Sequence, residues 1–203
     1  MSAKRQLFIF AKAPRLGHVK TRLAAAIGAR AACAFYERSL RDVLDRLDGT
    51  DAWRTRLAVT PDETALDASL WPRPTPRVAQ GPGDLGMRMG RLLALASPEG
   101  PVIVVGSDIP ELRAEHVVAA FEALGSHDLV LGPASDGGYW LIGASGPLPK
   151  SVLTGVRWST EHALADTLRN AAALSVALLP DELEDVDDHE SYRRFLERTG
   201  ARP

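Results

Sequence analysis

The sequence predicts a three-layer α/β/α protein built on a mixed, mostly parallel sheet. Short apolar runs rich in β-branched residues alternate along the chain with longer segments whose apolar residues recur at helical spacing. This alternation is typical of a sheet with helices on both faces. The chain has 203 residues, which predicts a single domain, 1–203, with one core of ordinary size.

Composition and charge exclude several classes of partner. The net charge of −2 gives no broad attraction to nucleic acid or to anionic lipid. No stretch approaches the roughly 18 consecutive apolar residues that suggest a membrane span. The single cysteine, Cys33, has no partner for an internal disulfide. We therefore expect a cytoplasmic protein that acts on small molecules, and the sequence leaves both a monomer and a homodimer open.

A basic loop follows the first predicted strand, Gln6–Lys12. Pro14 and Gly17 predict a turn there, and Thr21 is a candidate cap for the long helix that comes next. A strand, a glycine-containing basic loop and a helix N-terminus favour a bound phosphate, although a solvated basic turn explains the same pattern. The candidate phosphate-binding residues are Lys12, Ala13, Pro14, Gly17, Lys20 and Arg22.

A glycine-rich stretch, 80–88, follows a second strand at Arg54–Thr60 and a short third strand at 77–80. Asp84 is expected to cap the helix that begins within this stretch. Glycines around a helix start weaken the helix, so one explanation is close approach of the backbone to a flat or charged ligand. Gln80 would then bind a base and Arg88 a phosphate. A tight loop without a function is the other explanation.

Asp108 is the first charged side chain beyond the buried strand predicted at 101–105. Ligands of open α/β sheets bind beyond the carboxyl ends of the strands, so this carboxylate faces a candidate site. It either caps the next helix, predicted at 113–124, or binds a metal ion. The pentapeptide that contains it favours the cap when it is taken alone.

Asp136 lies in the turn between two further strands, predicted at 128–131 and 139–143. The sequence Asp136-Gly137-Gly138 predicts either a plain hairpin or a cleft in which a substrate comes close to the carboxylate. Trp158 follows later and either stacks on a sugar or base or lies half-buried in the core. Thr160 is a candidate cap for the helix that begins there.

Asp185 and Asp187 belong to an acidic run before the last predicted helix, 191–198. A solvated acidic loop is the usual explanation of such a run. In an extended segment, however, the alternation directs both carboxylates to the same side, which suits a hard cation. A nucleoside diphosphate near bare carboxylates would be repelled, so acidic ligands imply a divalent ion between them. Mg²⁺ or Mn²⁺ fits a set of oxygen ligands.

Six short motifs occur in order along residues 6–195. They are Lys12-Ala13-Pro14 with Val19-Lys20-Thr21-Arg22-Leu23, Gln80-Gly81 with Gly83-Asp84-Leu85-Gly86, Gly106-Ser107-Asp108-Ile109-Pro110, Gly132-Pro133-Ala134 with Asp136-Gly137-Gly138-Tyr139, Trp158-Ser159-Thr160, and Asp185-Val186-Asp187. Together they resemble the bacterial DUF2064 family, many of whose members are named radical-SAM/selenodomain-associated transferases. The resemblance implies a nucleotide-diphospho-sugar transferase fold of the glycosyltransferase-A (GT-A) type. It also implies distant similarity to the 2-phospholactate and molybdenum-cofactor guanylyltransferases.

The resemblance also implies roles for individual residues. Asp108 would be the metal-binding acid of a DXD-like position that has only one acid here, with Asp187 and its neighbour Asp185 supplying the missing ligands. The nucleotide would contact Lys12, Ala13, Pro14, Gly17, Lys20, Arg22, Gln80, Gly81, Asp84, Arg88 and Ser107. The acceptor or sugar would contact Gly137, Gly138, Tyr139, Trp158 and Thr160.

Three functions fit these residues. The first is sugar transfer from a nucleoside diphosphate sugar to a small-molecule acceptor, with Lys20 and Arg22 stabilising the leaving diphosphate and Asp136 as the base. Glu161 and His162 are reserve bases. The second is nucleotidyl transfer, in which a nucleoside triphosphate is attacked at its α-phosphorus. The third is nucleotide binding without catalysis. All three require the carboxylates of Asp108 and Asp187 to share one hollow.

Overall fold

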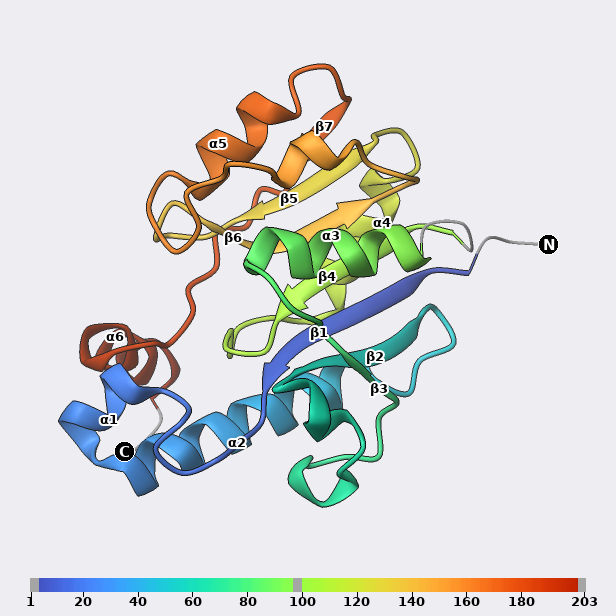
Figure 1. Cartoon of the computed structure of the whole chain (residues 1–203). Coiled ribbons are helices and arrows are strands. Elements are labelled where there is room, and N and C mark those ends of the chain that lie inside the picture. Colours follow the sequence, from blue (N-terminus) through green and yellow to red (C-terminus); the bar gives the residue numbers. More distant parts are fainter. Residues whose placement is uncertain (1–3, 97–99, 201–203) are drawn as a thin grey trace.

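The protein is an α/β structure around one seven-stranded sheet, as the sequence predicts. The computed structural model describes residues 4–96 and 100–200. The strand order is β3-β2-β1-β4-β6-β5-β7, and helices cover both faces of the sheet (Figure 1). β6 runs antiparallel to β4 and β5, and the other neighbouring strands are parallel. The sheet is therefore mixed and mostly parallel.

The helices and strands alternate along most of the chain. The strands are β1 Gln6–Lys12, β2 Arg54–Thr60, β3 Arg77–Ala79, β4 Val102–Gly106, β5 Leu129–Pro133, β6 Tyr139–Ala144 and β7 Val176–Leu178. The α-helices are α1 Thr21–Ile27, α2 Ala29–Leu47, α3 Leu85–Ala96, α4 Ala114–Ala123, α5 Ala163–Asn170 and α6 His189–Thr199. Short 3₁₀ helices are η1 Asp62–Ala65, η2 Ala68–Leu70 and η4 Lys150–Leu153.

Successive residues of β1 face opposite layers of the core. Leu7 and Ile9 pack with α2 and α4, whereas Phe8 packs with α3 on the other face. This follows from the pleat of a strand, in which neighbouring side chains point to opposite sides. Leu7, Phe8 and Ile9 are all buried, so the centre of β1 is covered on both faces, as expected for a strand between two layers of helices.

The helix expected between Thr21 and Leu47 is divided in two. Gly28 separates α1 from α2 with φ 85, a left-handed value that an α-helix does not contain and that glycine adopts without a steric penalty. A third apolar cluster then packs α6 against α1 and α2, with the rings of Phe35 and Tyr192 edge to face at 5.1 Å. Figure 1 shows α6 beside α1 for this reason.

None of the helices within 4–96 and 100–200 has the length and apolar character needed to cross a bilayer.

Candidate functional site

A cavity of about 660 Å³ opens beyond the ends of β1 and β4, where ligands of open α/β sheets bind. One side of it is acidic and carries Asp108, Asp136, Asp185 and Asp187. The other side is mainly apolar and aromatic, with Leu85, Met89, Tyr139 and Trp158. The structure therefore brings together residues from all six sequence motifs, the first and second being represented by Arg22 and Leu85.

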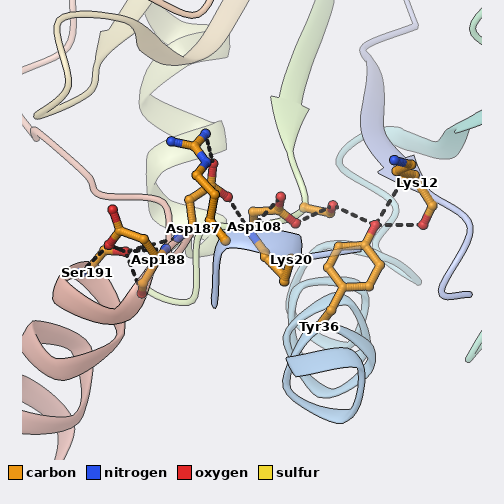
Figure 2. Close-up of polar contacts among 9 residues, drawn as sticks. Lys12, Lys20, Tyr36, Asp108, Asp187, Asp188 and Ser191 are labelled. Atoms are coloured by element: carbon orange, nitrogen blue, oxygen red, sulfur yellow. Dashed lines mark hydrogen bonds and ion pairs between the residues drawn. The ribbon is translucent and has the colours of Figure 1, made fainter. Parts of the chain in front are cut away.

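Lys20 lies between two of these carboxylates. Its Nζ is 2.8 Å from Asp108 Oδ2 and 2.6 Å from Asp187 Oδ1, and its side chain is only 3% exposed. Figure 2 shows the three side chains pointing toward one another from three separate segments. Asp108 and Asp187 thus meet in one hollow, as expected, but an ammonium group occupies the point between them.

The charge of Lys20 is secured by its two partners. Burial by itself lowers the pKa of the amine, but Asp108 and Asp187 outweigh burial and raise it above its ordinary value. The backbone of Lys20 is left-handed, with φ 48 and ψ 44, which is uncommon for a residue with a side chain. Strain of this kind persists only where surrounding contacts fix it, and it clusters at functional sites.

Asp108 is held in place from several directions. Ser107 Oγ donates a hydrogen bond of 3.1 Å to its Oδ1, while Lys20 pairs with Oδ2. The backbone carbonyl of Asp108 accepts a 3.1 Å hydrogen bond from Val186 N. This last bond ties the end of β4 to the segment that carries Asp185 and Asp187, which explains why distant acidic motifs converge.

Tyr36 links Ser107 to the first loop, and the sequence identified it only as a core residue of α2. Its hydroxyl donates to the carbonyl of Lys12 and accepts from Lys12 N, each at 2.8 Å, and lies 3.5 Å from Ser107 Oγ. The side chain of Lys12 itself is exposed at the end of β1 (Figure 2). A core tyrosine at helical spacing gives no sequence signal that its hydroxyl supports a site.

The start of α6 positions Asp187. Asp188 is the N-cap of this helix and its Oδ1 accepts a 2.9 Å hydrogen bond from Ser191 N. Ser191 Oγ in turn accepts from the backbone N–H of Asp187 at 3.0 Å and of Asp188 at 3.1 Å. Arg22, whose side chain is 74% exposed, reaches Asp187 Oδ2 from outside at 3.3 Å. The sequence indicates Ser191 only as a residue of the last helix, and no local pattern shows that its hydroxyl supports Asp187.

Asp185 carries the least compensated charge of the acidic side. Burial and the charge of Asp187 raise the pKa of its carboxyl to about 6, and Lys20 offsets only part of this. Oxygen donors with excess negative charge have the chemistry that Mg²⁺ or Mn²⁺ prefers, and an ammonium ion already stands among them. Yet no three acidic, histidine or cysteine side chains of residues 4–96 and 100–200 are arranged to hold one ion. The metal site therefore remains a prediction.

The apolar side of the cavity is built around Trp158. Gly86 in α3 lies so close that an added Cβ would be 2.5 Å from Trp158 Cζ2. Tyr139 meets the indole edge to face, with ring centroids 6.2 Å apart. The indole Nε1 is buried and has no hydrogen-bond partner among the described residues. Because such donors are normally satisfied, Nε1 is a candidate contact for a ligand.

The loop that carries Trp158 is fixed by a buried carboxylate. Asp166 in α5 accepts hydrogen bonds from Arg157 Nε and Nη2 at 2.8 and 2.9 Å, and from Arg169 Nη1 at 2.8 Å. These bonds hold the pKa of Asp166 far below its ordinary value. Thr160 accepts from His162 N at 3.3 Å and so stabilises the turn before α5, which begins three residues later than Thr160.

Asp136 closes the turn between β5 and β6. Its Oδ1 accepts a 2.8 Å hydrogen bond from Gly138 N, and Gly137 has φ 82. An added Cβ at Gly137 would lie 2.4 Å from the carbonyl oxygen of Glu161, so this turn packs closely on the loop that follows Trp158. The turn joins two antiparallel strands, as the hairpin explanation predicts, and Asp136 also lines the cavity. Approach of a substrate to its carboxylate stays a prediction.

The rest of the first loop provides shape rather than contacts to the acidic cluster. Ala13 is buried, and its N–H donates to the carbonyl of Thr60 at 2.8 Å. The carbonyl of Pro14 lies 3.8 Å from Cys33 Sγ. Gly17 is exposed with φ 77, in agreement with the predicted turn.

The glycine-rich stretch 80–88 is held mostly by its own side chains. Gln80 is buried, and its Nε2 donates to the carbonyl of Ala58 at 2.8 Å, so the amide nitrogen helps to hold the sheet. Asp84 caps α3 by accepting from Met87 N at 2.8 Å, as predicted. Contact between Gln80 and a base stays a prediction. Because Nε2 already bonds to the sheet, such a contact would be made by the amide oxygen.

Two arginines of α3 donate hydrogen bonds to backbone carbonyls of this stretch. Arg88 Nε donates to the carbonyl of Gly83 at 2.8 Å, and Arg91 Nη1 donates to the carbonyl of Gln80 at 2.6 Å. At Gly81, whose φ is 81, an added Cβ would lie 2.2 Å from Arg91 Nη1. Arg91 was missed because nothing in its spacing distinguishes it from a solvated helix residue.

A second cavity, of about 750 Å³, adjoins the first through Ser135, Glu184 and Arg194. Its charges are largely satisfied within the protein, since Arg194 and Arg198 pair with Glu184 at 2.6 and 2.9 Å. The acidic cavity has the excess charge and the unpartnered donor, and it is therefore the candidate active site.

Comparisons with known proteins agree with this architecture. Residues 43–160 match the family described as "Uncharacterized protein conserved in bacteria (DUF2064)". The 3-phospho-D-glycerate guanylyltransferase of Phenylobacterium zucineum (strain HLK1) is 34% identical over an alignment of 182 residues, with a coverage of 82% for this chain and 82% for that one.

Solved structures extend the likeness to three dimensions. A protein from Desulfovibrio desulfuricans G20, provisionally described as a nucleotide-diphospho-sugar transferase, is 31% identical with a TM-score of 0.83, covering 91% of this chain and 82% of that one. Rv0371c of Mycobacterium tuberculosis H37Rv, crystallised in complex with manganese, shares the fold at a TM-score of 0.56 and 16% identity, covering 96% and 98%. The chain has the nucleotide-diphospho-sugar transferase fold and belongs to the DUF2064 family.

Proposed function

We propose that this protein is a nucleotidyltransferase that joins a nucleoside monophosphate to the phosphate group of a small phosphorylated acid. The observation that carries the proposal is the likeness to a guanylyltransferase over four fifths of both chains. The cavity supports it, because carboxylates and lysine meet at the strand ends where nucleotides bind in this fold class. Guanosine triphosphate is the first donor to test.

The reaction is a substitution at the α-phosphorus of the triphosphate. A phosphate oxygen of the acceptor forms the new bond to that phosphorus, the bond to the β-phosphate oxygen breaks, and pyrophosphate leaves. Lys20 and Arg22 would supply positive charge where negative charge develops. Asp108, Asp185 and Asp187 are the oxygen donors that would hold Mg²⁺ or Mn²⁺ once their side chains move together, since no three described acidic side chains are arranged for one ion as they stand. The ion would neutralise charge on the triphosphate and on the departing pyrophosphate.

A phosphorylated acceptor needs no general base. A phosphate monoester has a second pKa of about 6, so its oxygens are already largely ionised at neutral pH. This agrees with the position of Asp136, the strongest base candidate, which commits Oδ1 to Gly138 N. In nucleotidyl transfer Asp136 is thus a turn residue on the wall of the cavity.

Sugar transfer is the second candidate. It is supported by the Desulfovibrio desulfuricans protein, which is 31% identical and carries that provisional description. An acceptor hydroxyl would need a base in this case, and Asp136 would supply it, with Glu161 and His162 in reserve.

One set of assays separates the two candidates. The protein is incubated with Mn²⁺ and guanosine triphosphate, with and without 3-phospho-D-glycerate, and pyrophosphate is measured. Parallel reactions contain nucleoside diphosphate sugars, and release of the nucleoside diphosphate is measured. We expect pyrophosphate only when both donor and acceptor are present. Turnover of sugar nucleotides without turnover of triphosphates would replace our proposal with sugar transfer.

Asp108→Asn tests whether the reaction uses the cavity. Loss of a charged group that stabilises the transition state commonly costs 10²–10³-fold, so we expect kcat to fall by about 100-fold or more. Asp42→Asn is the matched control, because Asp42 lies on the exposed side of α2 away from the cavity. An unchanged rate in Asp108→Asn would remove this carboxylate from the machinery.

A further inference from the structure

Lys20 stands where a cation shared by Asp108 and Asp187 would stand. Its ammonium nitrogen is 2.8 Å from one carboxylate and 2.6 Å from the other, and the side chain is almost inaccessible to solvent. Two positive ions cannot occupy one point between the same two oxygens, because like charges at such a distance repel strongly. An ammonium group and a divalent ion therefore compete for this pair of carboxylates.

We propose that Lys20 is a resident counter-ion that a divalent cation displaces, and that the freed ammonium then pairs with the phosphates of the substrate. The inference rests on the metal requirement of the proposed function and goes beyond it by giving Lys20 two positions. In the metal-free protein the lysine keeps the acidic pair together. In the loaded protein the same lysine neutralises the polyanion.

The charge balance of the cavity favours the exchange. Seven acidic residues line it, and four of them, Asp108, Asp136, Asp185 and Asp187, form the acidic side. Among the described residues, Lys20 and Arg22 are the cations that pair with members of this group of four. Arg22 meets Asp187 with a largely exposed guanidinium, where water weakens the attraction. Negative charge thus remains in excess, and a divalent ion offsets more of it than one ammonium group does.

The carboxylates do not depend on Lys20 alone for their positions. Ser107 Oγ holds the oxygen of Asp108 that Lys20 does not contact, and Val186 N holds its backbone carbonyl. On the other side, Ser191 Oγ accepts from the backbone of Asp187. Asp108 and Asp187 are therefore each held by hydrogen bonds that do not involve Lys20. The site can keep its shape after the ammonium group leaves.

Substitution of Lys20 tests the competition directly. Mn²⁺ binding to the wild type, Lys20→Met and Lys20→Arg is measured by electron paramagnetic resonance without nucleotide. Methionine keeps the apolar stem and removes the charge, so we expect Mn²⁺ to bind about tenfold more tightly or better, since it no longer displaces a cation. Arginine keeps the charge, and we expect binding no tighter than in the wild type. Equal or weaker binding to Lys20→Met would overturn the proposal.

Chemical labelling tests the same step without any substitution. Lysines of the wild type are acylated with a limiting amount of acetic anhydride, with and without Mg²⁺ at a saturating concentration, and the modified peptides are quantified by mass spectrometry. We expect Lys20 to react slowly without Mg²⁺ and several-fold faster with it. Lys150, which is exposed, serves as the internal control. Unchanged labelling of Lys20 in the presence of Mg²⁺ would refute the displacement.

Both experiments omit nucleotide and acceptor, so they separate this inference from the proposed reaction. Metal-dependent release of Lys20 in a protein that never forms pyrophosphate would retain the exchange and reject nucleotidyl transfer. Pyrophosphate formation with no effect of Mn²⁺ or Mg²⁺ on Lys20 would retain nucleotidyl transfer and reject the exchange.

Discussion

Lys20 and Asp187 are 167 positions apart in the sequence, and their side chains meet at 2.6 Å. The contact depends on α6, which packs on α1 and α2 through the edge-to-face rings of Phe35 and Tyr192. The final helix is therefore part of the architecture of the site, because its packing brings the last acidic motif to the first basic loop. Several consequences can be measured.

Asp136→Asn distinguishes the two transferase reactions. The amide oxygen of asparagine can still accept from Gly138 N, so we expect the turn to remain intact. Nucleotidyl transfer to a phosphate needs no base, and kcat should then stay within about tenfold of the wild-type value. General bases contribute 10²–10⁴-fold, so a fall of about 100-fold or more would instead assign Asp136 as a base. Steady-state kinetics with the preferred donor measures the difference.

Trp158→Phe tests whether the indole nitrogen contacts a substrate. Nε1 is buried without a partner, and a neutral hydrogen bond to a ligand contributes about 0.5–1.5 kcal/mol. We therefore expect the KM of one substrate to rise by about three- to tenfold while kcat changes little. Separate KM values for donor and acceptor show which of them lies on the aromatic side. If neither KM changes, the indole nitrogen contacts neither substrate.

Gly86→Ala and Gly90→Ala form a matched pair within α3. An added Cβ at Gly86 would lie 2.5 Å from Trp158 Cζ2 and 2.7 Å from the carbonyl oxygen of Leu153, so it must displace both segments. We expect destabilisation of about 1–3 kcal/mol, as for other overpacked sites.

Gly90 provides the contrast, because its added Cβ would lie 3.5 Å from Leu153 Cδ1, an ordinary contact. Alanine is favoured over glycine inside a helix, so Gly90→Ala should stabilise the protein by up to about 1 kcal/mol. Urea unfolding of both variants measures the free energies. Equal effects at the two positions would mean that Trp158 does not pack on α3 as described.

Asp166→Asn should make stability less dependent on pH in the acidic range. Hydrogen bonds from Arg157 and Arg169 hold the pKa of Asp166 below the 3.8 of an unperturbed aspartate. A carboxyl with a lowered folded-state pKa contributes stability above its unfolded pKa and loses that contribution as pH falls through the folded value.

The wild type should therefore exceed Asp166→Asn in melting temperature at pH 7, with a gap that narrows as the pH falls below about 4. Thermal unfolding of both proteins between pH 7 and pH 3 checks this. A gap that does not change over this range would mean that the ion pair contributes nothing through its charge.

Much of the fold could be predicted from the sequence. The strand β4 lies in an uncharged, β-branched run, α2 repeats its apolar residues at helical spacing, and both lie close to where they are expected. The sequence motifs also predicted that Asp108 and Asp187 share a hollow, since the carboxyl ends of parallel strands meet at one edge of the sheet.

The finer arrangement could not be predicted because it depends on side-chain directions set by tertiary contacts. The left-handed backbone of Lys20 sends its amine toward the carboxylates, and no local pattern indicates such a residue. Gln80 is buried and its Nε2 bonds to the backbone of β2, a structural role that its sequence context does not indicate. The periodicity of a single sequence indicates which face of a helix or strand a residue lies on. It does not indicate which group will be the hydrogen-bond partner of a polar side chain.

The position of Asp187 also has a consequence for synthesis. Lys20 leaves the ribosome 167 residues before its second carboxylate partner is made, a delay of about 8–33 s at typical elongation rates. Throughout that interval the nascent chain holds an unfinished cluster in which the lysine has at most one of its two acids. The acidic cluster is therefore complete only after Asp187 has been made, and a product that stops before α6 would keep all seven strands but lose the packing that positions Asp187.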